Sequence, residues 1–275
     1  IGYQSNIQDS LKISYNTLDE FINALVKGIR TPVKKFNDIG MFDDAGVAQQ
    51  ISTGILQIEN ELYDIVRPKR SGPSGSRPAT LLKKSGIEYL ELRGIDINPF
   101  IPEGIDTNKI KLLDIYIIHS LISESPLMLD EEIKEIRANQ KIMVCEGRLK
   151  NAMLSKGGEL VSLTELRKNF LAELEQTAKA LDEYSKGYLD AFHLETSKNK
   201  LPSEKILNDM ESNGCEFKDY ALNQSKIIAE NFNSFDASDF SALTNSAQSS
   251  IEKLSILEES SSMDINKYVE LYNSK

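Results

Sequence analysis

Two side chains that could bind a metal ion and a phosphate group lie two positions apart in one short stretch of the sequence, with a tyrosine two positions before them. Tyr89, Glu91 and Arg93 occupy every second position of the segment 86–93, and in a β-strand this spacing places them on one face of the sheet. A carboxylate oxygen is a ligand that Mg²⁺ prefers, and an arginine guanidinium matches the oxygens of a phosphate group. The segment therefore predicts a strand with a polar face that could hold a metal ion and a phosphate.

A second polar face is predicted earlier in the chain, in the segment 54–63. At period two, Gln57, Glu59, Glu61 and Tyr63 share one face there, and Ile58 and Leu62 lie on the other face. A basic, proline-containing stretch at 67–70 ends the predicted strand. Two short polar strands are thus expected to lie in the same part of the fold.

An alternative interpretation needs no function for either face. Carboxylates and guanidiniums commonly form solvated faces or surface salt bridges, and Glu91 could pair with Arg93 or with Arg70. A polar face that is buried without partners would cost free energy. The spacing alone leaves both interpretations open.

The elements that must position these residues are mostly helices. Between Ser14 and Ile29 apolar residues recur at helical spacing, with Asn16 or Thr17 as the cap, and Pro32 closes that helix. Further helices are predicted at 107–122, 130–149, 162–181, 203–212, 217–232 and 237–257, with a short terminal helix after a polar break at 260–262.

Three of these helices carry more detailed predictions. The helix at 107–122 is apolar on nearly all sides, which is typical of a buried central helix. The helix at 130–149 is expected to turn four residues inward, Ile133, Ile136, Ile142 and Met143. The third opens at Ser162-Leu163-Thr164-Glu165, which has the sequence of a capping box.

Together these patterns predict an α+β fold. A few antiparallel strands, near 51–63 and 86–95, belong to a portion of a catalytic domain at residues 1–106, and a mainly helical region covers residues 107–275. The segment 36–48 is expected to be a loop. Two short strands do not form a stable sheet by themselves. We therefore expect the rest of the sheet to lie upstream, in an N-terminal half that this chain lacks.

The composition excludes several classes of partner. The chain has 275 residues, and its 42 acidic against 32 basic residues give a formal net charge of -10, which repels nucleic acid and anionic membranes. The densest apolar run, at 115–118, is far shorter than a membrane span. ATP is not excluded, because a few basic side chains and a metal ion can reverse the field within one cleft. We expect no nucleic-acid partner and no membrane partner.

The cysteines and histidines predict no further chemistry. Cys145 and Cys215 form no C-x-x-C pair. One disulfide between them is an open alternative, but we expect two free thiols in a reducing, cytoplasmic environment. His119 and His193 are too few and too isolated for a zinc site built on imidazoles.

Four ordered motifs carry a resemblance to a known family. They are Leu56-Gln57-Ile58-Glu59-Asn60-Glu61-Leu62-Tyr63, Arg67-Pro68-Lys69-Arg70, Gly86-Ile87-Glu88-Tyr89-Leu90-Glu91-Leu92-Arg93 and Asp96-Ile97-Asn98-Pro99-Phe100. In this order they resemble a signature of the proteobacterial glutamate–cysteine ligases, or γ-glutamylcysteine synthetases. The resemblance is densest over 51–106, is recognisable at 8–35 and 145–148, and is faint beyond residue 150. The chain departs from the family pattern at 71–78 and 149–151.

The resemblance implies a glutamine-synthetase-like catalytic sheet and a reaction that depends on ATP and Mg²⁺. ATP phosphorylates the γ-carboxylate of glutamate, and the amine of cysteine then displaces the phosphate, which is the first step of glutathione synthesis. By position, Glu91 resembles the family's metal-binding glutamate. Arg93 resembles the catalytic, substrate-binding arginine that meets the transferred phosphate, and Tyr63 a substrate-binding tyrosine of the cysteine pocket. Weaker candidates, for which a structural salt bridge is an equal alternative, are Glu59, Glu61 and Arg70.

The resemblance also implies that this chain alone is incomplete. The family's other metal-binding glutamates belong to the N-terminal half of the enzyme, and one carboxylate does not hold a cluster of Mg²⁺ ions. We therefore expect the isolated chain to be inactive. Two alternatives stay open: a carboxylate–amine ligase of the same superfamily with a different acceptor, and a non-catalytic helical interaction module.

Overall fold

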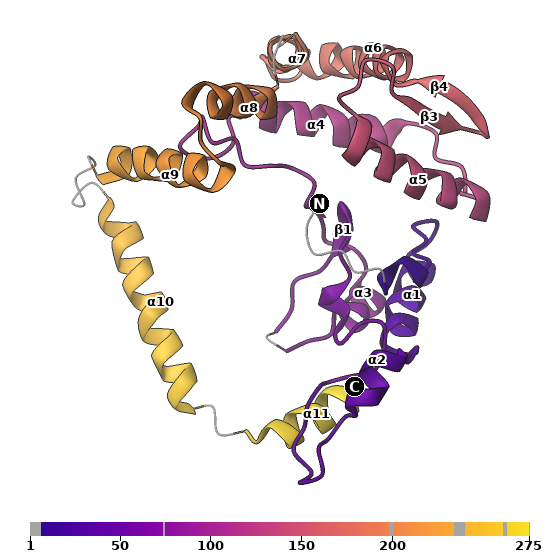
Figure 1. The fold of residues 1–275 in the computed structure, drawn as a ribbon, viewed down its shortest axis with the longest axis vertical. Coiled ribbons are helices and arrows are strands. Elements are labelled where there is room, and N and C mark those ends of the chain that lie inside the picture. The colour runs from indigo at the N-terminus through magenta and orange to yellow at the C-terminus, as the bar shows by residue number, and fades with distance from the viewer. Residues whose placement is uncertain (1–6, 74, 198–200, 234–239, 261–262, 275) are drawn as a thin grey trace. The chain divides into compact units, whose positions relative to one another are not determined.

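The chain forms two compact units. The computed structural model describes residues 7–73, 75–197, 201–233, 240–260 and 263–274 (Figure 1). The first unit comprises Ile1–Ile95, Leu127–Ile133 and Ile251–Lys275, and the second comprises Asp96–Pro126 and Lys134–Ser250. The division into domains at residues 106 and 107 stays a prediction, because compactness alone does not identify an independently folding domain.

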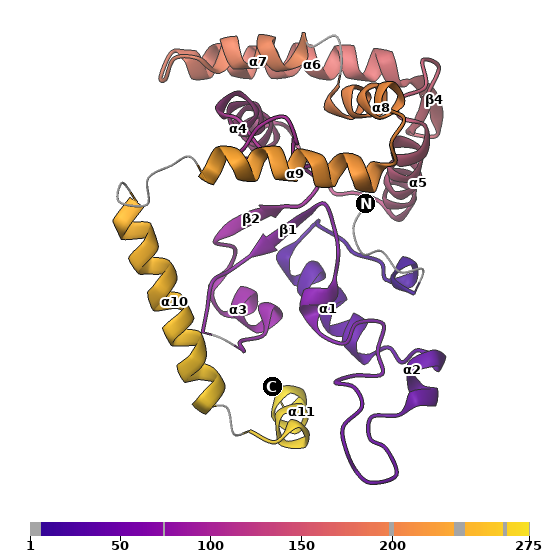
Figure 2. The same ribbon diagram turned by 60° about the vertical axis from the view of Figure 1, so that its left-hand side comes forward.

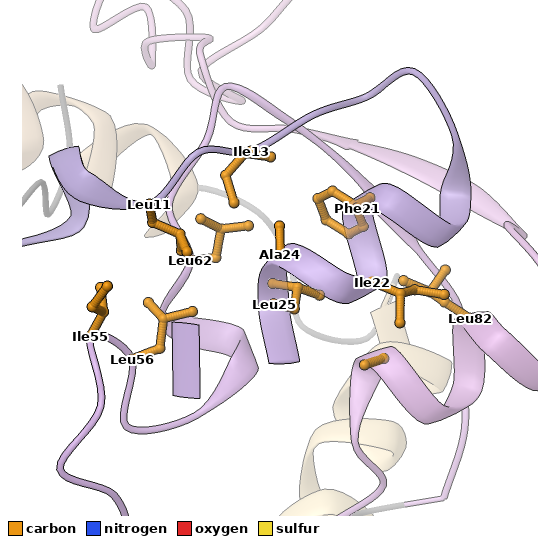
Figure 3. Close-up of a cluster of buried hydrophobic side chains, with 11 residues drawn as sticks. Leu11, Ile13, Phe21, Ile22, Ala24, Leu25, Ile55, Leu56, Leu62 and Leu82 are labelled. Carbon is orange, nitrogen blue, oxygen red and sulfur yellow. The ribbon is translucent and has the colours of Figure 1, made fainter. Parts of the chain in front are cut away.

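The first unit is built around helix α1 (Leu18–Arg30), which begins at one of the two predicted caps. The Thr17 hydroxyl accepts a hydrogen bond from the backbone N–H of Glu20, which satisfies one of the free donors at the helix start. The apolar face of α1 packs on Leu82 of helix α3 (Pro78–Ser85) (Figure 3). The buried residues of this core are Leu11, Ile13, Phe21, Ile22, Ala24, Leu25, Ile55, Leu56, Leu62, Ala79 and Leu82.

Shorter helices complete this unit. The predicted loop at 36–48 is wrong at its start, where helix α2 forms. A glycine with positive φ, Gly40 (φ 79°), ends α2, a conformation that is costly for other residues. The remaining short helices of the unit are η1 (Gln8–Ser10) and η2 (Glu59–Glu61), both 3₁₀, and α11 (Ile265–Asn273); α2 itself spans Lys34–Ile39.

Two strands of the first unit pair as an antiparallel sheet (Figure 2). Strand β1 spans Val66–Lys69 and strand β2 spans Tyr89–Leu92. Their register places Arg67 opposite Glu91. The second predicted strand is therefore confirmed in a shorter form, and its partner lies in the basic stretch that was expected to end the first strand.

The strand predicted at 54–63 is wrong. Gly54 makes only an isolated bridge, to Pro32, and the 3₁₀ helix η2 stands near the end of the segment. The side-chain oxygen of Gln57 accepts hydrogen bonds from the backbone N–H groups of Ile51 and Ser52, at 3.1 Å each. Such bonds from a side chain to a nearby backbone compete with strand pairing, so the chain curls here instead of extending.

The core of the second unit lies among three helices. Helix α4 spans Thr107–Ile122, α6 spans Leu163–Asp182 and α7 spans Tyr188–Thr196. An ion pair joins α4 to α7. Nζ of Lys109, whose side chain is 40% exposed, lies 2.6 Å from Oε2 of Glu195, whose side chain is 1% exposed. The buried apolar residues of this core are Ile115, Leu174, Ala178 and Phe192.

The predicted burial of α4 is wrong, although its bounds are confirmed. Ile115 is its buried residue, whereas Leu121 is 80% exposed and Ile122 is 69% exposed. Helix α5 (Asp130–Glu146) likewise has no fully buried residue. Of the residues expected to face inward, Ile133 and Ile142 are partly covered, and Ile136 and Met143 are exposed. Within the described residues, α6 and α7 pack on one part of the α4 surface. The prediction failed because an apolar sequence pattern does not determine how many faces of a helix are covered by other elements.

A small hairpin between α5 and α6 was not predicted from the sequence. Strands β3 (Met153–Lys156) and β4 (Glu159–Ser162) are antiparallel, and Gly157 and Gly158 between them both have positive φ. This two-glycine turn is the signal that could have predicted the hairpin. The Glu135 carboxylate of α5 accepts hydrogen bonds from both glycine N–H groups, at 2.9 and 2.8 Å.

The other predicted helices are confirmed, and so is the α+β class. The predicted capping box precedes α6, although the Ser162 side chain makes no capping hydrogen bond. None of the described helices combines the length and the apolar content that crossing a membrane requires. The later helices are α8 (Pro202–Asn213), α9 (Phe217–Asn233) and α10 (Ser241–Ser260); the first residues of the helix predicted at 237–257 and part of the polar break at 260–262 lie outside the described residues.

Candidate functional site

The candidate site is a group of charged side chains on strands β1 and β2. The Nε and Nη2 atoms of Arg67 donate to Oε2 of Glu91, at 3.0 and 2.7 Å. Arg93 donates from Nε to the same oxygen at 3.0 Å and from Nη2 to Oε1 at 3.3 Å. Both oxygens of the Glu91 carboxylate are therefore engaged by guanidinium groups.

Arg67 is held from its other side by the turn that precedes β1. Its residue surface is 4% exposed, and its Nη1 donates to the carbonyl oxygens of Asn60 and Leu62, at 3.1 and 2.5 Å. These carbonyls belong to η2 and its end, where helical oxygens lack partners within the helix. The 3₁₀ turn thus fixes the guanidinium that faces Glu91.

The neighbouring cations control the charge of this group. Burial acts to raise the pKa of Glu91, but hydrogen bonds and charge from Arg67 and Arg93 outweigh it and hold the pKa at about 2. The pKa of Lys69 is lowered, first by burial and then by the charge of Arg67, while Glu91 partly opposes the change. We call Arg67, Lys69, Glu91 and Arg93 the β1–β2 charge cluster; one carboxylate faces three basic side chains, so the cluster favours anions.

The structure brings together the three site residues that the resemblance indicated. Arg93 lies 2 positions from Glu91 and bonds to it, and the Cζ atom of Arg93 lies 5.7 Å from the centre of the Tyr63 ring. That distance is within the range of a cation–π contact. Arg67 was missed, because its importance depends on strand pairing with Glu91; a strand placed over 66–69 would have been the signal.

The salt-bridge interpretation of Glu91 is also correct in its geometry. Glu91 pairs with Arg93, as one form of that interpretation expected, and does not pair with Arg70. Instead, Nη1 of Arg70 donates to the carbonyl oxygen of Ser85 at 2.7 Å. Pairing and a functional role are compatible, since an ordered guanidinium can bind a second anion with its remaining donors.

The weaker candidates have structural partners. The Glu59 side chain is fully buried, and its Oε1 lies 2.6 Å from Nη2 of Arg77. Its Oε2 accepts a hydrogen bond of 2.6 Å from the backbone N–H of Ala79, in the first turn of α3, where a negative charge is favourable. Glu61 accepts a hydrogen bond from the backbone N–H of Gln57, at 2.5 Å.

A magnesium site is not complete in the part of the chain that the structure describes. No three Asp, Glu, His or Cys side chains lie close enough there to hold a metal ion. Glu91 supplies one carboxylate, and both of its oxygens already accept from arginine. A small cavity beside Arg67, lined also by Glu59 and Leu82, has room for about one water molecule. The described residues therefore do not provide the ligand set of a Mg²⁺ site by themselves.

Comparison with known proteins gives three further findings. A family model described as glutamate-cysteine ligase matches residues 1–143. Glutamate–cysteine ligase of Alcanivorax borkumensis is 35% identical over 84% of this chain and 46% of its own length. The enzymes of Pseudomonas paraeruginosa and Pseudomonas putida are each 33% identical over the whole chain, and the matches cover 53% and 54% of their lengths.

A solved structure agrees with these sequence matches. The crystal structure of glutamate–cysteine ligase from Francisella tularensis in complex with AMP superimposes with a TM-score of 0.86 and 27% sequence identity. The match covers 98% of this chain and 54% of that chain. The chain thus spans about half the length of the relatives it matches.

Proposed function

This chain belongs to the glutamate–cysteine ligase family, and we propose that it contributes part of the active site of an ATP-dependent enzyme that joins glutamate to cysteine. The observation that carries the proposal is the β1–β2 charge cluster, in which two arginines are ordered by one carboxylate. Fixed guanidinium donors are suited to a phosphoryl group, because they stabilise its charge without further reorganisation.

The proposed reaction has two steps. The γ-phosphoryl group of ATP moves to an oxygen of the glutamate γ-carboxylate, which produces ADP and γ-glutamyl phosphate. The amine nitrogen of cysteine then attacks the acyl carbon, the carbon–oxygen bond to phosphate breaks, and inorganic phosphate leaves. The product is γ-glutamylcysteine, the first intermediate of glutathione synthesis.

The residues of this chain have distinct proposed roles. Arg93 binds the transferred phosphoryl group, and Arg67, which is nearly inaccessible, holds Glu91 in place. Tyr63, beside the Arg93 guanidinium, lines the pocket for cysteine. An uncharged ring surface there suits the small side chain of the cysteine acceptor, while the arginines bind the phosphoryl group.

The proposed cofactor is Mg²⁺, with ATP as a co-substrate. The described residues do not complete a metal site. Oε1 of Glu91 accepts a single hydrogen bond from arginine, so Glu91 would be one ligand through its remaining acceptor capacity, with the other oxygen ligands coming from elsewhere. We propose that the half of the family sequence that this chain does not span supplies those ligands and the rest of the nucleotide and glutamate pocket. The isolated chain should accordingly be inactive.

A coupled assay of ADP release tests this function. The chain would be assayed alone and together with the complementary half of a family member, with glutamate, ATP and Mg²⁺, in the presence and absence of cysteine. We expect turnover that needs both halves and cysteine, and a loss of roughly 100-fold in kcat in Glu91→Gln. Glu103→Gln, an exposed carboxylate of the second unit, is the matched control and should retain full activity.

Each outcome of the assay has a definite meaning. If turnover is unaffected by Glu91→Gln, the proposed ligase activity stands, but Glu91 has only the structural role of a salt bridge. Turnover by the isolated chain would refute the proposed sharing of the site. Replacing cysteine by 2-aminobutyrate, serine or alanine then measures acceptor selectivity, since a different acceptor remains the simplest change within the superfamily.

We also propose a cytoplasmic location. Cys145 and Cys215 are free thiols, as the sequence predicted, and free thiols persist in reducing compartments. Fractionation of cells that express the tagged protein would test this location.

A further inference from the structure

Helix α11 returns to the first unit from the far end of the sequence. The Asn266 side chain accepts a hydrogen bond from the backbone N–H of Ala48 and donates one to the carbonyl oxygen of Gly46, each at 2.8 Å. Nδ2 of Asn273 donates to the carbonyl oxygen of Ile51 at 2.9 Å. Val269, between these two residues, is 2% exposed. These contacts span more than 200 positions in sequence and hold α11 against the loop before η2.

One residue of α11 reaches the ion pair that supports η2. The ring of Tyr272 lies 5.5 Å from Cζ of Arg77, which is a cation–π distance. Burial, and after it the nearby Glu59 carboxylate, raise the pKa of Tyr272, while Arg77 and a hydrogen bond with the Glu59 backbone oppose the change. Tyr272 therefore covers a pair in which the Glu59 side chain is 0% exposed and that of Arg77 is 13% exposed.

The 3₁₀ turn η2, which this ion pair supports, also fixes the position of Arg67 in the candidate site. Glu59 is the first residue of η2, and the carbonyl oxygens of Asn60 and Leu62 in and just after η2 accept from Arg67. Arg67 then donates twice to Glu91. An unbroken series of contacts thus runs from α11 to the β1–β2 charge cluster, entirely within the first unit.

We propose that Tyr272 is a positioning residue for the ligase site, acting through Arg77, Glu59 and Arg67 on Glu91. The proposal rests on the proposed function, and it assigns a role to a segment outside the residues that the family model matches. Tyr272 touches neither the cluster nor a substrate, so its effect is on the geometry of the arginines. A small displacement of such groups lowers a rate strongly even when substrates still bind.

Hydrogen–deuterium exchange of the chain tests whether Tyr272 orders η2, and it does not require enzymatic activity. In Tyr272→Ala we expect amide exchange over residues 59–63 to accelerate by about tenfold or more, because local opening becomes easier there, while α1 stays within about twofold of the parent. Tyr272→Phe keeps the ring over Arg77 and removes only the hydrogen bond between the hydroxyl and the Glu59 backbone, so protection should be retained at residues 60–63. The matched control is Tyr184→Ala, at a residue of the second unit that is 90% exposed.

Kinetics of the assembled enzyme separate positioning from general stability. Tyr272→Ala should lower kcat by about tenfold, with KM for ATP and for glutamate within about twofold, and Tyr272→Phe should restore kcat. If amide exchange at residues 59–63 is unchanged in Tyr272→Ala, or if exchange in α1 accelerates equally, Tyr272 does not act through Arg77, Glu59 and Arg67, and the proposal is wrong. If the parent enzyme has no ligase turnover, the proposed function fails, and the exchange experiment still decides whether α11 orders the turn.

Discussion

The charge state of Glu91 offers a quantitative test of the candidate site. The pKa of Glu91 lies at about 2, below its ordinary 4.5, because the hydrogen bonds from Arg67 and Arg93 outweigh the effect of burial. At about 1.4 kcal/mol for each tenfold change in proton affinity, this corresponds to an upper limit of about 3 kcal/mol of folding free energy. The Glu91 side chain is 30% exposed, and screening by water reduces the figure to about 2 kcal/mol.

The sign of the pH dependence follows from the direction of the pKa change. A carboxyl group with a lowered pKa in the folded state stabilises the protein above its unfolded pKa, and that stabilisation is lost as the pH falls towards the folded pKa. Between about pH 7 and about pH 3.5, roughly 1 kcal/mol of it should disappear. In Glu91→Gln this loss cannot occur, since the amide does not titrate over that range.

Urea denaturation at several pH values measures this difference. The free energy of unfolding of the parent should approach that of Glu91→Gln by about 1 kcal/mol between about pH 7 and about pH 3.5. The exposed control Glu103→Gln should keep the pH dependence of the parent. A constant difference between the parent and Glu91→Gln at all pH values would show that Glu91 is not held by Arg67 and Arg93.

Three further predictions concern stability. Glu59→Gln should lower the free energy of unfolding by about 3 kcal/mol, measured by urea denaturation, because it leaves the mostly buried Arg77 without its charged partner. Leu56→Ala should cost about 3 kcal/mol at a residue that is 0% exposed, whereas Leu121→Ala, at 80% exposure, should cost less than about 0.5 kcal/mol in the same assay. Gly158→Ala should cost about 1 kcal/mol in thermal unfolding, because Gly158 has φ 84° in the β3–β4 turn; equal midpoints for the variant and the parent would contradict it.

Helices were the most predictable part of the fold. Thr17 caps α1 and Asp106 caps α4 through hydrogen bonds to backbone N–H groups three residues later, so the signals for these helix starts lie within one turn of the boundary. The degree of burial was not predictable in the same way. Leu121 and Ile122 belong to an apolar pattern but are exposed, because burial depends on which other helices or strands pack against that face.

Part of the candidate site was predictable as well. The alternation of Glu91 with Arg93 and the family motifs predicted that both residues and Tyr63 belong together, and the structure places the three side chains next to one another; their membership of one functional site stays a prediction. The family model ends at residue 143, yet relatives match the whole chain, so the likeness that was faint beyond residue 150 extends further than the motifs indicated.

What the sequence determined by itself is therefore local: helix starts, the polar alternation of β2 and the motifs of the family. Tertiary structure decided the rest. Arg67 faces Glu91 across 24 positions, and Tyr272 reaches Arg77 from the other end of the chain. Glu59, which the alternating pattern placed on a strand face, is instead buried against α3. Hydrogen bonds within a helix join residues four positions apart, whereas strand pairing and buried ion pairs join residues whose separation in sequence carries no period to detect.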